Sequence, residues 1–139
     1  MATLTEQKLA PAEPSDGLDY RAIYTRYYET ENDDSPLGSR WSLMKRMHRV
    51  VALSPVQLIG IDVGAGKQIL ERDYQRYLER RKLTPNVWMH TVDIAEIDQN
   101  DLLADPSWTF HHIADCRNLT GEFSNHTFDI AISNMALDF

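Results

Sequence analysis

The sequence predicts an α/β fold in which helices flank a parallel sheet of about four strands. Short apolar runs of strand length alternate with longer segments whose apolar residues recur at helical spacing. The first apolar run also ends in Gly64-Ala65-Gly66, a pattern typical of a tight turn from a buried strand into a helix. The resulting β-α-β order implies parallel strands joined by a right-handed crossover.

Three parts of the chain differ in composition. Residues 1–17 contain few large apolar side chains, and we expect them to form a flexible tail. Residues 18–55 predict a helical segment, and residues 56–139 hold the alternating pattern of the sheet domain. With 139 residues, the chain has room for one domain with a modest core.

Two helices are predicted in the N-terminal segment. Aromatic and aliphatic residues recur at helical spacing between residues 18 and 28. A second helix should begin near Ser35-Pro36, since an N-cap serine followed by a first-turn proline is typical of helix starts. It should end before Ser54-Pro55, because the residue before a proline is pushed out of the α region.

The elements of the sheet domain follow in order along the chain. The predicted strands are residues 56–63, 87–92, 108–113 and 128–133. Helical spacing predicts a helix over residues 67–82 and a short helix over 98–104. Residues 84–86 and 121–127 carry turn and loop signals.

Composition weighs against several classes of function. The formal net charge of −7 disfavours non-specific binding to nucleic acid, because phosphate contacts need clustered Lys and Arg. No run is long and apolar enough to predict a membrane span. Cys116 is the one cysteine, so no internal disulfide is expected and a reducing, cytoplasmic location is predicted. The histidines lack zinc-site spacing, so no metal site is predicted.

The glycine turn is compatible in part with three kinds of nucleotide site. A P-loop needs a glycine where Ile61 stands and a hydroxyl where Gln68 stands, so we reject that interpretation. A dinucleotide-binding turn fits Gly64 and Gly66 but has Ile69 at its third glycine position. The third kind is a site for S-adenosylmethionine (SAM), and further segments of the chain bear on it.

Residues 59–66 (IGIDVGAG) resemble the first motif of class I SAM-dependent methyltransferases, an apolar strand followed by Asp/Glu-x-Gly-x-Gly-x-Gly. This chain departs from the motif at the last glycine, which is Gln68. The next strand ends in Asp93, and residues 110–115 also resemble a segment of the family. Residues 128–137 (FDIAISNMAL) are similar to the fourth-strand motif of the group that methylates small molecules and lipids.

The resemblance implies a Rossmann-like domain with SAM as its cofactor. Asp62 and the glycine-turn backbone would hold the methionyl end of SAM, Asp93 would bind the ribose hydroxyls, and Asp115 would contact the adenine amino group. The implied cofactor-binding residues are Asp62, Gly64, Ala65, Gly66, Asp93, Ile94, Asp115, Cys116 and Asn134. The alternative for Asp93 is an N-cap on the next helix, and ligand binding is favoured over it; for Asp115 a capping or loop role is supported as well as ligand binding.

No catalytic base is predicted. His111 and His112 are candidates, but neighbouring residues of a strand point to opposite faces, so at least one of them should be structural or exposed. The predicted function is methyl transfer from SAM to a small-molecule or lipid acceptor. The alternatives are a non-catalytic SAM-binding remnant and a nicotinamide-binding module.

The fourth strand raises a question of completeness. In the seven-stranded methyltransferase fold this strand lies beside the first, and further strands follow it. Here it would be an exposed apolar edge, which is a liability for aggregation. We expect a truncated fragment of that fold. The alternatives are a homo-oligomer or partner chain that covers the edge, and N-terminal helices folded over it.

Overall fold

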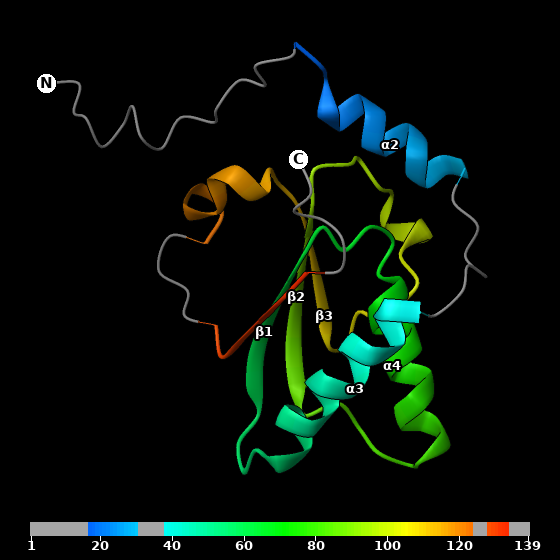
Figure 1. The fold of residues 1–139 in the computed structure, drawn as a ribbon, viewed down its shortest axis with the longest axis vertical. Helices are drawn as coiled ribbons and strands as arrows, with labels where there is room; N and C mark the ends of the chain where they lie inside the picture. The colour runs from blue at the N-terminus through cyan, green and yellow to red at the C-terminus, as the bar shows by residue number, and fades with distance from the viewer. Residues whose placement is uncertain (1–16, 31–37, 124–127, 134–139) are drawn as a thin grey trace, which may run out of the picture.

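The computed structural model describes residues 17–30, 38–123 and 128–133 (Figure 1). Almost all of the predicted tail lies outside these residues, as do the predicted helix start at Ser35-Pro36 and the candidate site residue Asn134. None of the helices in the described ranges is long and apolar enough to cross a membrane.

A four-stranded sheet organises the described part of the chain. Its strands are β1 (Leu58–Val63), β2 (Val87–Asp93), β3 (Thr109–Ile113) and β4 (Ile130–Ile132). They run parallel in the order β3-β2-β1-β4, so the fourth strand lies beside the first. This arrangement confirms the predicted fold class, an α/β fold with a Rossmann-like parallel sheet.

Three α-helices accompany the sheet in the described residues, namely α2 (Tyr20–Thr30), α3 (Gly38–Leu53) and α4 (Ile69–Arg80). α3 ends at Leu53, directly before Ser54-Pro55, which confirms the helix end predicted from the proline. α4 connects β1 to β2 and completes the predicted β-α-β unit. Figure 1 shows α3 and α4 alongside the sheet, and α2 near the carboxyl ends of the strands.

The main core lies between the sheet and the pair of helices α3 and α4. On both helices, apolar side chains recur every three or four residues and form the stripe that is buried. The buried members of this core are Met44, Met47, Val51, Leu70, Tyr74, Leu78, Val87, Met89, Ala104, Trp108 and Ile132. Burial of a large apolar side chain contributes about 1.5–3 kcal/mol, so this cluster is the main apolar support of the fold.

The opposite face of the sheet is covered less completely. Phe123 packs there against Ile61 and Val92, at the end of the 3-10 segment η2 (Cys116–Gly121). Trp88 and Phe110 pack edge to face and remain 47% and 38% exposed. Turn residues predict a loop here from residue 121 onward, whereas η2 has no clear signal in the sequence.

The connection after β2 contains less helix than predicted. A helix over residues 98–104 was expected, but only the 3-10 turn η1 (Gln99–Asp101) forms. Asp98 caps this turn by accepting the Asn100 N–H at 2.9 Å. The Leu103 N–H then donates to the Lys67 carbonyl at 3.0 Å, so a long-range contact replaces the continuation of the helix.

β4 is an edge of the described sheet. It has three residues and pairs with β1. Asp129, just before it, extends the contact, because its N–H donates to the Ile59 carbonyl and its carboxylate accepts the Ile59 N–H. These contacts attach β4 firmly to β1. They do not test whether another chain covers the outer edge, so that expectation stays a prediction.

Removal of the Asp73 carboxylate tests the docking of α3 on α4. Asp73 accepts a hydrogen bond from Arg40 Nε at 2.9 Å, and their side chains are only 10% and 11% exposed. We expect Asp73→Ala to lower the free energy of unfolding by about 1.5–3 kcal/mol, because a charge-assisted hydrogen bond is lost. Glu79→Ala, at an exposed position of the same helix, should change it by less than about 0.5 kcal/mol. Equal effects in chemical denaturation would contradict this view of the interface.

Candidate functional site

The candidate site lies at the carboxyl ends of β1 and β2, where the chain turns into α4. Gly64 and Gly66 have φ angles of 75° and 58°, which glycine adopts without steric cost. The N–H groups of Gly64 and Ala65 both donate to the Val92 carbonyl, at 2.8 and 3.1 Å. The glycine turn after β1 is therefore bound directly to the end of β2.

Gln68 stands where the methyltransferase motif has its last glycine. Its backbone is left-handed, with φ 68° and ψ 39°, and it directly precedes α4. This region costs a non-glycine residue roughly 1–2 kcal/mol. The buried side chain offsets part of that cost, because Gln68 Nε2 donates to Thr91 Oγ1 at 2.8 Å. The residue departs from the motif, but the backbone keeps a glycine-like conformation.

A row of hydrogen bonds continues from Gln68 across β2 to β3. Thr91 Oγ1 accepts from Gln68 and lies 2.9 Å from His111 Nδ1. The threonine hydroxyl can accept two hydrogen bonds and donate one, so the tautomer of His111 sets which of the two groups donates. His111 Nε2 is buried and has no partner among the described residues. Burial also lowers the pKa of His111, which favours the neutral ring.

Asp93 ends β2 and connects the two turns at this edge of the sheet. Its Oδ2 accepts the Gly66 N–H at 2.8 Å, and its Oδ1 accepts the Ala95 N–H at 2.9 Å. A carboxylate has about four acceptor positions, so roughly two remain for other donors. Asp93 therefore caps the turn that follows β2, which is the structural role that the sequence offered as an alternative to ligand binding. Its role in ribose binding stays a prediction.

Asp62 and Glu71 form a buried carboxyl pair behind the glycine turn. Asp62 is 2% exposed and Glu71 is fully buried. No described donor is placed to bond Asp62 Oδ1 or either Glu71 oxygen. The two carboxyl groups act on each other electrostatically, and one proton shared between them would satisfy both. Burial raises the pKa of Asp62 to about 6 and that of Glu71 well above its ordinary value.

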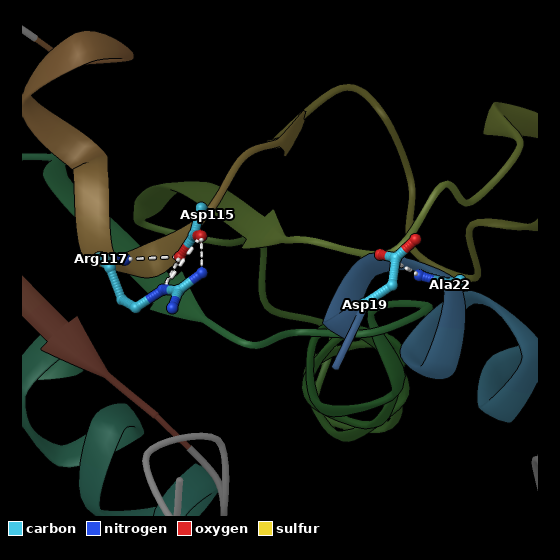
Figure 2. A network of polar contacts seen from close by, with 4 residues as sticks. All are labelled: Asp19, Ala22, Asp115 and Arg117. Atoms are coloured by element: carbon cyan, nitrogen blue, oxygen red, sulfur yellow. Dashed lines mark hydrogen bonds and ion pairs between the residues drawn. The ribbon is translucent and has the colours of Figure 1, made fainter. Parts of the chain in front are cut away.

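Asp115 begins η2 and is held by Arg117 (Figure 2). Its Oδ1 accepts the Arg117 backbone N–H at 2.9 Å, and the carboxylate pairs with the guanidinium. The Arg117 side chain bonded to it holds the pKa of Asp115 below its usual value. Asp115 therefore caps the start of η2. Its contact with the adenine amino group stays a prediction. Burial raises the pKa of the neighbouring Cys116 thiol, which disfavours the reactive thiolate.

α2 contributes to the same edge from the N-terminal side (Figure 1). Thr25 Oγ1 accepts the Glu96 N–H at 2.9 Å, which connects α2 to the loop after β2. Asp19 caps the start of this helix by accepting the Ala22 N–H at 3.2 Å, as Figure 2 shows. The helix predicted over residues 18–28 is therefore present and lies beside the candidate site.

The two adjacent histidines of β3 face opposite sides of the sheet, as predicted. His111 bonds Thr91 on the α4 side. On the other side, His112 Nε2 lies 2.9 Å from His90 Nδ1, and its Nδ1 lies 3.0 Å from Glu122 Oε1. Within the described ranges, no group of three His, Cys, Asp or Glu residues could hold a metal ion.

The structure brings together part of the predicted site. Asp62, the glycine turn and Asp93 meet at the carboxyl ends of β1 and β2. Ile94 follows Asp93 directly and is half-buried. Asp115 and Cys116 follow β3, where Asp115 is bonded to Arg117. Asn134 falls outside the described residues, so its predicted role is unplaced.

Glu71 is the site residue that sequence reasoning missed. In the sequence it is an acidic residue in the first turn of a helix, where it would ordinarily be exposed and favourable to the helix dipole. A signal was nevertheless present. Glu71 lies three and seven residues before Tyr74 and Leu78, on the buried stripe of α4. An acid on an apolar stripe indicates a buried polar contact.

Comparisons with protein-family models, with curated proteins and with solved structures found no match.

Substitutions at Gln68 test whether its backbone is held in a glycine-like conformation. Gln68→Ala and Gln68→Gly both lose the hydrogen bond to Thr91, but only glycine tolerates the left-handed region. We expect the glycine variant to have a free energy of unfolding about 1 kcal/mol higher than the alanine variant. Denaturant unfolding of the two variants measures this difference. An alanine variant as stable as the glycine variant would show that no such strain is present.

Proposed function

We propose that this chain binds SAM at the carboxyl edge of β1 and β2 and belongs to the class I SAM-dependent methyltransferases that act on small molecules or lipids. The observation that carries the proposal is the hydrogen bond from the Gly66 N–H to Asp93 Oδ2 at 2.8 Å. It holds the glycine turn beside the acid that ends the next strand, and these are the two features that resemble methyltransferase motifs. The position of β4 beside β1 agrees with the same family order.

The charges of the site favour a ligand with positively charged groups. SAM carries a methionyl ammonium and a sulfonium. Asp62 Oδ1 has no hydrogen-bond donor in the described structure, and Asp93 retains acceptor positions beside it. Asp62 would bind the ammonium, and Asp93 would accept hydrogen bonds from the ribose hydroxyls. The carboxylates of Asp62 and Asp93 interact electrostatically with each other. Both would therefore act on the same bound ligand.

The proposed role of the protein is to bind and orient. Bound SAM supplies the activated methyl group, so the chain has to position it against the acceptor. The amides of Gly64, Ala65 and Gly66 are bonded to Val92 and Asp93, so the backbone amides that favour the ligand carboxylate are those of the first turn of α4. α2 contacts the loop after β2 through Thr25 and would limit the access of water from that side.

The adenine role of Asp115 requires a change of partner. Its carboxylate is paired with Arg117 in the described structure, and the Arg117 side chain is 31% exposed. Ion pairs near the surface contribute only about 0–1 kcal/mol, so exchange of the guanidinium for an adenine amino group would cost little. We therefore retain Asp115 as the proposed adenine contact.

Calorimetric titration of the purified chain with SAM, S-adenosylhomocysteine and NAD tests the proposed function. We expect both SAM-type ligands to bind and NAD to bind far more weakly or not at all. Binding of NAD alone would reject the proposal in favour of a nicotinamide-binding module. Binding of SAM without turnover against a panel of small-molecule and lipid acceptors would identify the non-catalytic alternative.

A variant of Asp93 tests the proposed ribose contact. Asp93→Asn keeps one acceptor oxygen and loses the charge, so we expect the affinity for S-adenosylhomocysteine to fall roughly 10- to 100-fold. Asp101→Asn removes an exposed carboxylate from the same connection and should leave the affinity unchanged. Thermal unfolding of both variants shows whether the glycine turn is still held. Unchanged binding in a folded Asp93→Asn protein would exclude the contact.

A further inference from the structure

Glu71 has no part in the site as proposed so far, although it is acidic and fully buried. An ionised carboxylate in such surroundings is strongly disfavoured unless a cation or several donors bind it. Neither of its oxygens receives a hydrogen bond from a described donor. Its partner is the carboxyl group of Asp62, which is itself buried. The pair therefore needs a proton to be stable.

Among the described residues, no positively charged group acts on the pair. The charged groups that act on it are Asp93 from the end of β2 and Asp73 on α4, and both are acidic. Asp73 is already bonded to Arg40. The strand neighbours of Asp62 in register are neutral, namely Thr91 of β2 and Ile132 of β4. Two carboxylates in this environment do not both ionise near neutral pH.

A further residue with a buried, unpartnered acceptor stands three positions before Glu71 in the chain. Gln68 Oε1 has no hydrogen-bond donor in the described structure, and the residue is 1% exposed. The nitrogen of the same amide group bonds Thr91, the register neighbour of Asp62. Buried acceptors are normally satisfied, so this cluster points to an absent donor group. An ammonium, with three N–H donors and one positive charge, meets that requirement.

We infer that Asp62 and Glu71 act as one unit that holds a single proton on Glu71, and that this unit makes ligand binding depend on pH. The inference rests on the proposed function, in which Asp62 faces the ligand ammonium. Glu71 is a positioning residue: its O–H donates to the Asp62 carboxylate and keeps the one negative charge on Asp62. When Asp62 also gains a proton, the unit becomes neutral and holds an ammonium weakly.

The same unit gives the free protein a pH dependence of stability. The folded-state pKa values of Asp62 and Glu71 lie above their ordinary values of 3.8 and 4.5. Between the ordinary and the raised values, the folded state binds more protons than the unfolded state. Stability from this unit is therefore present at low pH and is lost as pH rises through the raised pKa values. In Glu71→Gln the amide donates to Asp62 at every pH, so the loss should be smaller.

The ligand test compares two nucleosides by calorimetry between pH 5 and 8. S-adenosylhomocysteine carries the ammonium, whereas 5′-deoxy-5′-methylthioadenosine has the same nucleoside without the amino acid. With Asp62 titrating at about 6, we expect wild-type affinity for S-adenosylhomocysteine to be about tenfold lower at pH 5 than at pH 7.5. Affinity for methylthioadenosine should change little over the same range.

Matched variants identify the residue responsible. Glu71→Gln keeps a neutral donor to Asp62 and should keep the wild-type pH profile for S-adenosylhomocysteine, as should Glu79→Gln on the same helix. Glu71→Leu removes the donor, so the Asp62 pKa should rise and the midpoint of the profile should move to higher pH. If both nucleosides follow the same profile in the wild type, the inference is wrong and the proposed function still stands. If S-adenosylhomocysteine binds at no pH, the proposed function fails, and the ligand coupling fails with it.

A measurement on the free wild-type protein covers the case in which Glu71→Gln does not fold. The infrared carbonyl stretch of a protonated carboxylic acid should be present at pH 7, where exposed Asp and Glu side chains are ionised. It should disappear only at higher pH, as the buried unit loses its proton. Absence of this band at pH 7 would overturn the shared proton whatever the ligand data show.

Discussion

The hydrogen bonds that Asp93 accepts are the constraint on which the candidate site depends. One carboxylate receives the Gly66 N–H from the turn after β1 and the Ala95 N–H from the turn after β2. Two backbone segments about thirty residues apart are thereby fixed to one side chain. The Val92 carbonyl, which accepts two further N–H groups of the glycine turn, reinforces the same junction. The start of α4, and with it Glu71, takes its position from this junction.

The α4 side of the sheet changes in character along the strands. Toward the amino ends, Val87 and Met89 of β2 are fully buried in the apolar core. Toward the carboxyl ends, the same face carries Thr91, Asp93 and, from β1, Asp62. Apolar burial stabilises one half of the domain. The other half holds buried polar groups whose hydrogen-bonding capacity is only partly used, as expected for a ligand site in an open parallel sheet.

Periodicity in the sequence was sufficient to predict the strands and the long helices, because each depends on local spacing of apolar residues. The end of α3 was also predictable, since the restriction imposed by Pro55 acts on its immediate neighbour. The placement of β4 beside β1 came from the family resemblance and was confirmed by the sheet order. Helical spacing over residues 98–104 predicted a helix that is longer than the 3-10 turn η1 that forms. The Leu103 N–H donates to the Lys67 carbonyl instead of continuing the helix.

The details of the site were less accessible from sequence, for physical reasons. Gln68 looked like a break in the glycine motif, and only its φ angle shows that the backbone conformation is retained. The contact between Asp62 and Glu71 depends on how α4 is rotated over the sheet, which apolar spacing defines only approximately. The bond between Asp115 and Arg117 is local, but a sequence pattern does not distinguish a capping aspartate from one that binds a ligand.

The central claim is that a SAM-type ligand binds against the glycine turn at the carboxyl ends of β1 and β2. The most direct test is to follow backbone amide resonances of the isotope-labelled chain by NMR while S-adenosylhomocysteine is added. We expect shifts at Gly64, Ala65, Gly66 and Ala95, and unchanged resonances at Leu58 at the opposite end of β1. Shifts confined to other parts of the chain, with the glycine-turn amides unchanged, would contradict it.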